Sequence, residues 1–128
     1  MKLLLDTCCW LWWLSDTSKL SQQQLEAIAN RRNQLFLSTA SIWEISIKVN
    51  SNKLTILTGL NKLIEKQCPI DNIIILEIKA HHAIKAGKLT LHHKDPFDRM
   101  IITQANSENL TVVTSDEIFQ KYDVSLLS

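Results

Sequence analysis

The chain has 128 residues, 45% of them hydrophobic, so we expect one domain over residues 1–128 with a well-buried core. Lys and Arg total 14 against 13 Asp and Glu, and this formal net charge of +1 excludes a strongly basic nucleic-acid binder. The three cysteines lack CxxC spacing and an even count, which argues against a disulfide framework or a zinc site and favours reduced thiols in the cytoplasm.

The first residues are apolar, but they do not have the pattern of a membrane segment or signal peptide. Asp6 interrupts the run, which is too short to cross a bilayer, and no small-residue cleavage site follows. Residues 2–5 instead predict a short buried strand, and residues 8–14 predict a helix. Residues 21–32 predict a second helix with Ser21 as its N-cap.

The middle of the chain alternates in the same way. Residues 34–37 predict a strand, and residues 38–49 predict a helix because their apolar side chains recur at helical spacing. A further helix is expected over about residues 58–66, and the β-branched residues 73–76 predict another strand.

Two more helices are expected before the last strands. Residues 77–86 predict a helix that Gly87 ends. Asp95 fits the N-cap and Pro96 the first position of a helix that reaches Ser107.

The end of the chain predicts a strand at residues 111–114, a short helix that starts at Ser115, and a last strand at about residues 124–127. The strands are uniformly apolar instead of alternating between apolar and polar residues. Such strands are typical of a parallel sheet that helices cover on both faces, so we predict an α/β fold.

Four acidic residues follow strands or lie in helices that follow strands: Asp6, Glu44, Asp98 and Asp116. Each also has a structural explanation. Asp6 and Asp116 can cap the helices after them, and Asp98 can complete a cap begun by Asp95. Glu44 can form an exposed ion pair with Lys48 one helical turn away.

The four acids have a common explanation as well. Parallel strands direct their following loops to one edge of the sheet, where ligands bind at a switch in strand order. Two like charges about 4 Å apart repel by about 4 kcal/mol at an effective dielectric constant near 20, so an empty cluster resists ionisation. A divalent ion relieves this repulsion, and the cluster therefore predicts a Mg²⁺ or Mn²⁺ site and phosphodiester chemistry.

The chain resembles the PIN-domain ribonucleases, and within them the VapC toxins of bacterial type II toxin–antitoxin pairs. The similar segments are LLLDT at residues 3–7, SIWEISIK at 41–48, HHKDPFDRMIITQA at 92–105 and TVVTSD at 111–116. No segment is specific alone, but the order and spacing of the four span nearly the whole chain. The resemblance implies a single PIN domain, a three-layer α/β/α sandwich with a central, mainly parallel sheet of about five strands.

By this resemblance the four acids are catalytic, and Mg²⁺ or Mn²⁺ is held by Asp6, Asp98 and Asp116. Glu44 would orient or deprotonate the attacking water, with Glu44 and Asp95 as auxiliary ligands. The resemblance implies an endoribonuclease that forms a homodimer and is neutralised by a cognate antitoxin lying across its active site.

Neighbouring residues are candidates for contacts with the substrate. Thr7 and Ser115 can hydrogen-bond a carboxylate or a phosphate, and Arg99 can form a salt bridge or contact the edge of the substrate. His93, with its neighbours His92 and Lys94, can form a positive lip for RNA phosphates. Adjacent histidines lack the i,i+4 spacing of a helical metal site, which disfavours metal ligation by them.

The tryptophans Trp10, Trp12 and Trp13 suit core packing, with a partner groove as the alternative. Two other functions are considered. A haloacid-dehalogenase-like phosphatase requires a second Asp two residues after the first, where this chain has Cys8. A catalytically silent PIN-like binding module would not need the complete set of acids.

Overall fold

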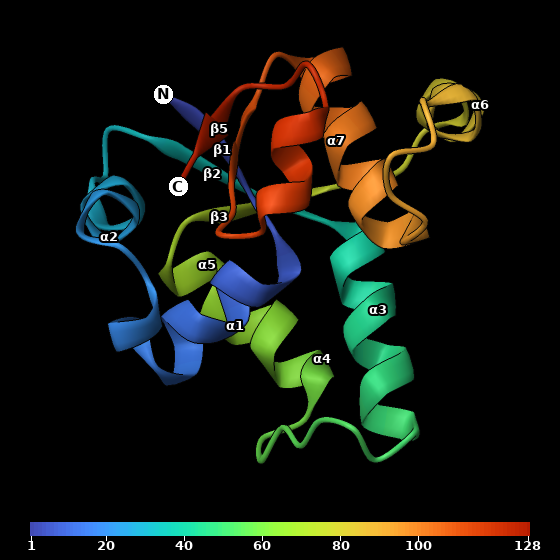
Figure 1. Ribbon diagram of the computed structural model, residues 1–128. Coiled ribbons are helices and arrows are strands. Elements are labelled where there is room, and N and C mark those ends of the chain that lie inside the picture. The colour runs from blue at the N-terminus through green and yellow to red at the C-terminus, as the bar shows by residue number, and fades with distance from the viewer.

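A single parallel sheet forms the centre of the molecule (Figure 1). In the computed structural model, which describes residues 1–128, its strand order is β3-β2-β1-β4-β5 and every neighbouring pair is parallel. The strands are β1 (Lys2–Leu5), β2 (Gln34–Ser38), β3 (Ile73–Leu76), β4 (Thr111–Val113) and β5 (Leu126–Leu127). The predicted three-layer α/β/α sandwich around a parallel sheet of five strands is confirmed.

Helices connect the strands, as the apolar parallel pattern predicts. They are α1 (Thr7–Ser15), η1 (Thr17–Lys19), α2 (Gln22–Ala29), α3 (Thr39–Asn50), α4 (Leu60–Lys62), η2 (Leu63–Gln67), α5 (Cys68–Ile70), α6 (Ala80–Lys88), α7 (Pro96–Glu108) and η3 (Glu117–Lys121). None of them has both the length and the apolar character needed to cross a membrane.

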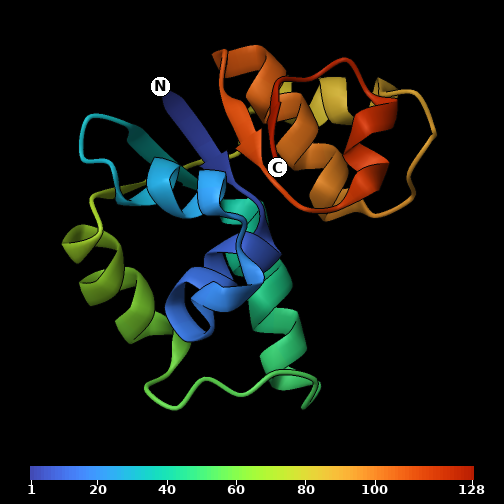
Figure 2. The ribbon, with the colours of Figure 1, turned by 60° about the vertical axis from the view of Figure 1, so that its left-hand side comes forward.

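The two faces of the sheet pack against different helices (Figures 1 and 2). Successive side chains of a strand point to opposite faces. Leu3 and Leu5 of β1 accordingly pack in a cluster with Trp10 of α1 and Ile28 of α2, whereas Leu4 packs with side chains of α7 and η3. All three leucines are fully buried, which explains why the strands read as continuous apolar runs.

The predicted core role is confirmed for Trp10, whereas Trp12 and Trp13 belong to the core only in part and each also lines a surface hollow. Trp10 is fully buried, and Trp12 and Trp13 are partly buried against the same cluster.

Several helix boundaries differ from the predictions. Gly87 lies inside α6, which begins at Ala80 and runs to Lys88, so Gly87 does not end that helix. A different helix, α7, ends in the left-handed conformation that often terminates helices, which Asn109 adopts with φ 56°. Helix α2 ends at Ala29, because the side chain of Asn30 accepts a hydrogen bond from the backbone N of residue 32 and turns the chain.

The helix predicted over residues 58–66 is longer, and its centre is wider than an α-helix. The segments α4, η2 and α5 follow one another without a break from Leu60 to Ile70, and η2 has π-helical hydrogen bonding. This helical run ends just before Asn72, a second asparagine in the left-handed conformation with φ 54°.

The arrangement places three helices around the carboxyl edge of the sheet. Helix α1 follows β1, α3 follows β2, and α3 contacts both α1 and α7. Strand β1 lies between β2 and β4, so the chain switches direction across the sheet at this point. In open parallel sheets this is where ligands bind.

Candidate active site

The carboxyl ends of β1 and β4 border a cavity of about 280 Å³. Its walls carry all four predicted acids and one more: Asp6, Glu44, Asp95, Asp98 and Asp116. They come from the ends of β1 and β4, from the middle of α3 and from the start of α7. The fold therefore gathers acids from both halves of the chain in one place.

Three of these acids also cap helices. Asp6 Oδ1 accepts a hydrogen bond of 2.7 Å from the backbone N of Cys9, and Asp116 Oδ1 accepts one of 3.1 Å from the N of Ile118. Asp95 Oδ1 accepts from the backbone N of residues 97 and 98 at the start of α7. An acid can therefore cap a helix and also belong to the cluster, because these helices begin at the same edge of the sheet.

Glu44 is held by two donors. Its Oε1 accepts a 2.8 Å hydrogen bond from Thr7 Oγ1, and its Oε2 accepts a 2.9 Å bond from Lys48 Nζ. The single hydroxyl hydrogen of Thr7 then points to Glu44, and Thr7 Oγ1 accepts from Ser41 Oγ at 2.9 Å. Only 9% of Glu44 is exposed, so the ion pair with Lys48 exists but is not the solvated surface pair considered above.

Two of the carboxyl groups are difficult to ionise. Burial raises the pKa of Asp98 to about 6, although a hydrogen bond from His93 lowers it; the charges of Asp95, Asp6 and Glu44 raise it further. Burial also raises the pKa of Asp6, and the charge of Asp116 adds to this effect. Burial is the main cause of both shifts, and the neighbouring carboxylates add to it.

The donor atoms of the cavity fit a divalent metal ion. Carboxylate oxygens are preferred ligands of Mg²⁺ and Mn²⁺. Lys48 is the one basic residue on the cavity wall, and its ammonium group is bonded to Glu44. Ligand atoms of His93, Asp98 and Asp116 all lie within 4.8 Å of one another. The spacing of adjacent histidines disfavours a metal site made by the histidines themselves. His93 can still ligate a metal ion, because its partner ligands are acids from α7 and from the end of β4.

The sequence matches a protein-family model described as the PIN domain over residues 3–125. The chain belongs to the PIN domain family.

Solved structures of similar fold include proteins of VapBC complexes. VapBC2 from Rickettsia felis bound to a promoter DNA fragment has a TM-score of 0.74 at 18% identity, covering 99% of this chain and 98% of that chain. DNA-bound VapBC from Salmonella typhimurium has a TM-score of 0.72 at 19% identity, covering 99% and 97%. VapBC-1 from nontypeable Haemophilus influenzae has a TM-score of 0.71 at 16% identity, covering 100% and 98%. Among curated protein sequences none matches this chain.

The predicted substrate-contacting residues of this PIN domain occupy different environments. Thr7 lies on the cavity wall and donates to the carboxylate of Glu44. Ser115 also lies on the wall, but its hydroxyl oxygen accepts from Gln24 Nε2 at 3.2 Å, and it bonds no carboxylate. Gln24, which is fully buried, thus connects α2 to the end of β4.

Arg99 is engaged by the loop before α7. Its guanidinium group donates to the backbone oxygens of Ala86, Leu89, Thr90 and His93 at 2.8 to 3.3 Å. It forms no salt bridge and does not line the acidic cavity, so the geometry favours a structural role over substrate contact.

Tyr122 also holds this loop through hydrogen bonds to its backbone. This residue was not identified from the sequence. Its hydroxyl oxygen accepts from the backbone N of His92 at 3.1 Å and of His93 at 2.9 Å. The hydroxyl donates to the oxygen of Thr90 at 2.7 Å. No local motif signals these contacts, because Tyr122 follows the loop by about thirty residues in the chain.

A second group of metal-binding residue types lies away from the cavity, where His81, His82 and Glu108 meet. The buried His82 accepts from the backbone N of Lys79 through Nδ1 at 3.0 Å, and its Nε2 lies 2.9 Å from Glu108 Oε1. Both ring nitrogens are therefore occupied, and a metal ion would need to displace one of these bonds. The group connects α6 to α7 and lowers the pKa of Glu108 through the hydrogen bond from His82.

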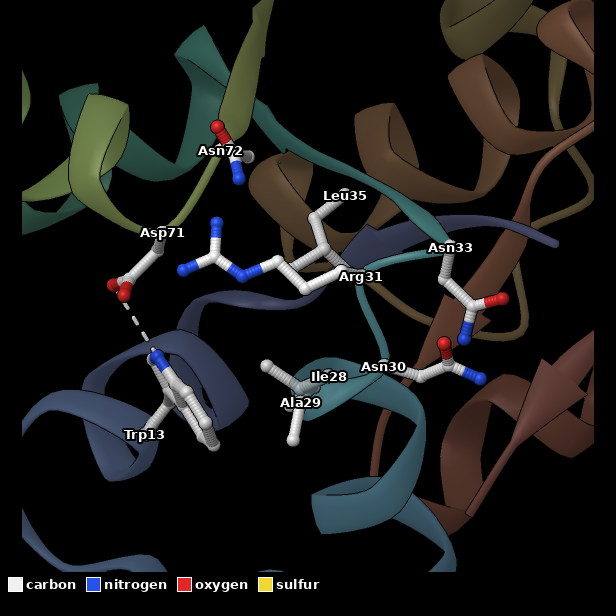
Figure 3. Close-up of a pocket in the computed structure, with 9 residues that line it drawn as sticks. All are labelled: Trp13, Ile28, Ala29, Asn30, Arg31, Asn33, Leu35, Asp71 and Asn72. Carbon is white, nitrogen blue, oxygen red and sulfur yellow. Dashed lines mark hydrogen bonds between the residues drawn. The ribbon is translucent and has the colours of Figure 1, made fainter.

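A smaller hollow of about 190 Å³ lies at the opposite, amino edge of the sheet (Figure 3). There the Arg31 side chain extends toward Asp71 and Asn72, and Trp13 Nε1 donates to Asp71 Oδ2 at 3.3 Å. Asp71 is its one acidic side chain, so this hollow lacks a cluster of acids.

Proposed function

We propose that this chain acts as a single PIN domain of the VapC type, an endoribonuclease that requires Mg²⁺ or Mn²⁺. The observation that carries the proposal is the cavity in which Asp6, Glu44, Asp98 and Asp116 meet. Membership of the PIN family and the likeness in fold to proteins of VapBC complexes support the biological role as the toxin of a toxin–antitoxin pair. We expect it to act in the cytoplasm as a homodimer.

Asp6, Asp98 and Asp116 would hold the ion, with Asp95 and Glu44 as auxiliary ligands. When bound, such an ion neutralises the carboxylates, polarises the scissile phosphate and increases the acidity of a nearby water molecule. The residues of the chain supply the rest. Glu44, fixed by Thr7 and Lys48, orients the attacking water and accepts its proton.

Attack of the water oxygen on phosphorus breaks the bond to the 3′ oxygen of the ribose. The departing 3′ oxygen takes a proton from solvent, so the products are a 5′-phosphate and a 3′-hydroxyl end, and Glu44 then returns the proton of the attacking water to solvent. The ammonium group of Lys48, on the cavity wall beside Glu44, presents a positive charge to the phosphate oxygens.

Cleavage of a mixed RNA substrate by purified protein in Mn²⁺ tests the proposal. Asp6→Asn and Asp98→Asn should each reduce the rate at least about 100-fold, the lower range for loss of a catalytic group. Asp123→Asn is the matched control, because Asp123 is exposed and outside the cavity, and it should cleave as wild type does. Wild-type activity in Asp98→Asn would contradict the assignment.

The proposed partnership is tested in cells. Induced expression should arrest bacterial growth, and co-expression of a small protein encoded beside this chain should relieve the arrest and co-purify with it. If the protein cleaves RNA but never affects growth, the toxin role fails while the nuclease role stands.

A further inference from the structure

His93 lies beside Asp98 and Asp116 at the margin of the acidic cluster; it is outside the lining of the cavity and is not one of the four acidic positions. Its Nε2 is 2.9 Å from Asp98 Oδ2, and the ligand atoms of His93, Asp98 and Asp116 lie within 4.8 Å of one another. The imidazole is largely enclosed, since 23% of its side chain is exposed.

The backbone on both sides of this imidazole is fixed by side chains from elsewhere in the fold. The backbone N of His93 donates to Tyr122 Oη, and its backbone O accepts from Arg99 at 3.1 Å. Tyr122 is itself 9% exposed, and its hydroxyl uses all three of its hydrogen bonds on this loop. These contacts fix the backbone of His93, and a metal ligand requires such precise placement.

The spacing of the three groups suits a shared ion. In an octahedral site with ligands at about 2.1 Å, neighbouring ligand atoms lie about 3 Å apart and opposite ones about 4 Å apart. The 2.9 Å between His93 Nε2 and Asp98 Oδ2 matches the first separation, and an ion held by both atoms would replace the hydrogen bond that joins them. The 4.8 Å limit on the separations within the whole group accommodates the second separation.

An imidazole nitrogen changes which ion the cavity prefers. Mg²⁺ takes oxygen ligands almost exclusively, whereas divalent transition metal ions that bind carboxylates also accept an imidazole nitrogen. We propose that His93 supplies a nitrogen ligand beside Asp98 and Asp116, so that the cavity selects an ion of the Mn²⁺ or Co²⁺ class over Mg²⁺. This inference rests on the proposed function, because it concerns the metal of that same site.

The alternative roles of His93 differ in what they predict for metal binding. If His93 only orients Asp98 by a hydrogen bond, its loss weakens all ions alike, and a side-chain amide can replace it. If His93 only contacts RNA phosphates, its loss leaves the binding of every metal ion unchanged. Only a nitrogen ligand gives a loss that depends on the ion.

The decisive experiment adds Mn²⁺ alone to metal-free full-length protein and measures ¹⁴N coupling to the bound ion by electron spin-echo spectroscopy. Wild type should show the coupling, and His93→Ala should lose it. Titration calorimetry should find that His93→Ala weakens Mn²⁺ at least about tenfold, the lower range for disturbing a metal-binding histidine, and Mg²⁺ much less.

Three further variants complete the test. His81→Ala removes an exposed histidine outside the cavity and should behave as wild type. Tyr122→Phe deletes the supporting hydroxyl and should weaken Mn²⁺ by an intermediate factor, as expected for a positioning residue. His93→Gln offers an amide donor to Asp98 but no imidazole, and it should remain as defective for Mn²⁺ as His93→Ala.

Absence of ¹⁴N coupling in wild type, equal losses for Mn²⁺ and Mg²⁺, or full recovery in His93→Gln would each overturn the ligand role. Thermal unfolding of the metal-free variants verifies that they are folded. A wild type that binds Mn²⁺ through nitrogen but cleaves no RNA would refute the proposed function and leave this inference intact.

Discussion

At the scale of single residues, the acids that form the cavity destabilise the metal-free fold. The pKa of Asp98 is raised from 3.8 to about 6, mainly by burial, so the folded state binds this proton more tightly than the unfolded chain does. Stability from this group is therefore fully present at low pH and is lost as the pH rises from about 4 through about 6. At neutral pH the penalty is at most about 3 kcal/mol, reduced by the partial exposure of the group.

Asp98→Asn should consequently stabilise the metal-free protein. We expect the free energy of unfolding at pH 8 to rise by about 1–2 kcal/mol, and the gain to shrink at pH 5, where the wild-type carboxyl is largely protonated in the fold. Denaturant unfolding at the two pH values measures this, with Asp123→Asn as the exposed control. An Asp98→Asn variant less stable than wild type at pH 8 would be inconsistent with the raised pKa.

The contact between Thr7 and Glu44 gives a second prediction at this scale. Thr7→Val keeps the shape of the side chain but leaves Glu44 Oε1 without its buried donor, so the cleavage rate should fall about tenfold, as for other supporting hydrogen bonds at metal sites. Unfolding should be easier by about 1–2 kcal/mol. Thr7→Ser restores the hydroxyl and should restore the rate. A wild-type rate in Thr7→Val would show that the hydrogen bond from Thr7 does not position Glu44 for cleavage.

At the scale of elements, the positions of strands and of the acids at their ends were predictable, whereas the supports between elements were not. Residues 3–5 and Ile73 are buried and lie in β-prone runs, so local pattern and tertiary packing favour the same structure. The end of α6 was mispredicted at Gly87, because the backbone there needs no left-handed conformation. The fastening of the His93 loop by Arg99 and Tyr122 depends on tertiary contacts that no motif encodes.

Substitution of Arg99 tests whether this residue supports the loop or contacts the substrate. Arg99→Ala removes the donor shared by several carbonyl groups of the loop, so we expect the free energy of unfolding to fall by about 1–3 kcal/mol. Hydrogen exchange should also quicken in residues 89–94. Unchanged stability together with weaker RNA binding would instead support the substrate contact predicted from sequence.

At the scale of the whole molecule, the two edges of the sheet have different chemistry. The carboxyl edge gathers five acids, of which Asp6 and Glu44 are buried, at a switch in strand order, and the amino edge has a hollow with a single acid beside Arg31. This asymmetry predicts that one edge binds a divalent cation, and that the cation stabilises the whole fold because the unfolded chain cannot gather these acids.

Mn²⁺ should therefore raise the melting temperature of the wild type. At a hundred times the dissociation constant the stabilisation is about 2.7 kcal/mol, enough to move the transition by several degrees. Asp6→Asn should lose most of this shift, and Arg31→Ala at the amino edge should keep it. A shift of the same size in Asp6→Asn would place the ion elsewhere.

The central claim is that the gathered acids use a divalent ion to hydrolyse RNA, and the chemistry of the cut ends tests it most directly. Purified protein is incubated with an end-labelled RNA in Mn²⁺ or in excess chelator, and the termini are identified. We predict cleavage only with Mn²⁺, leaving 5′-phosphate and 3′-hydroxyl ends. Undiminished cleavage in chelator, or ends carrying a 2′,3′-cyclic phosphate, would contradict the account.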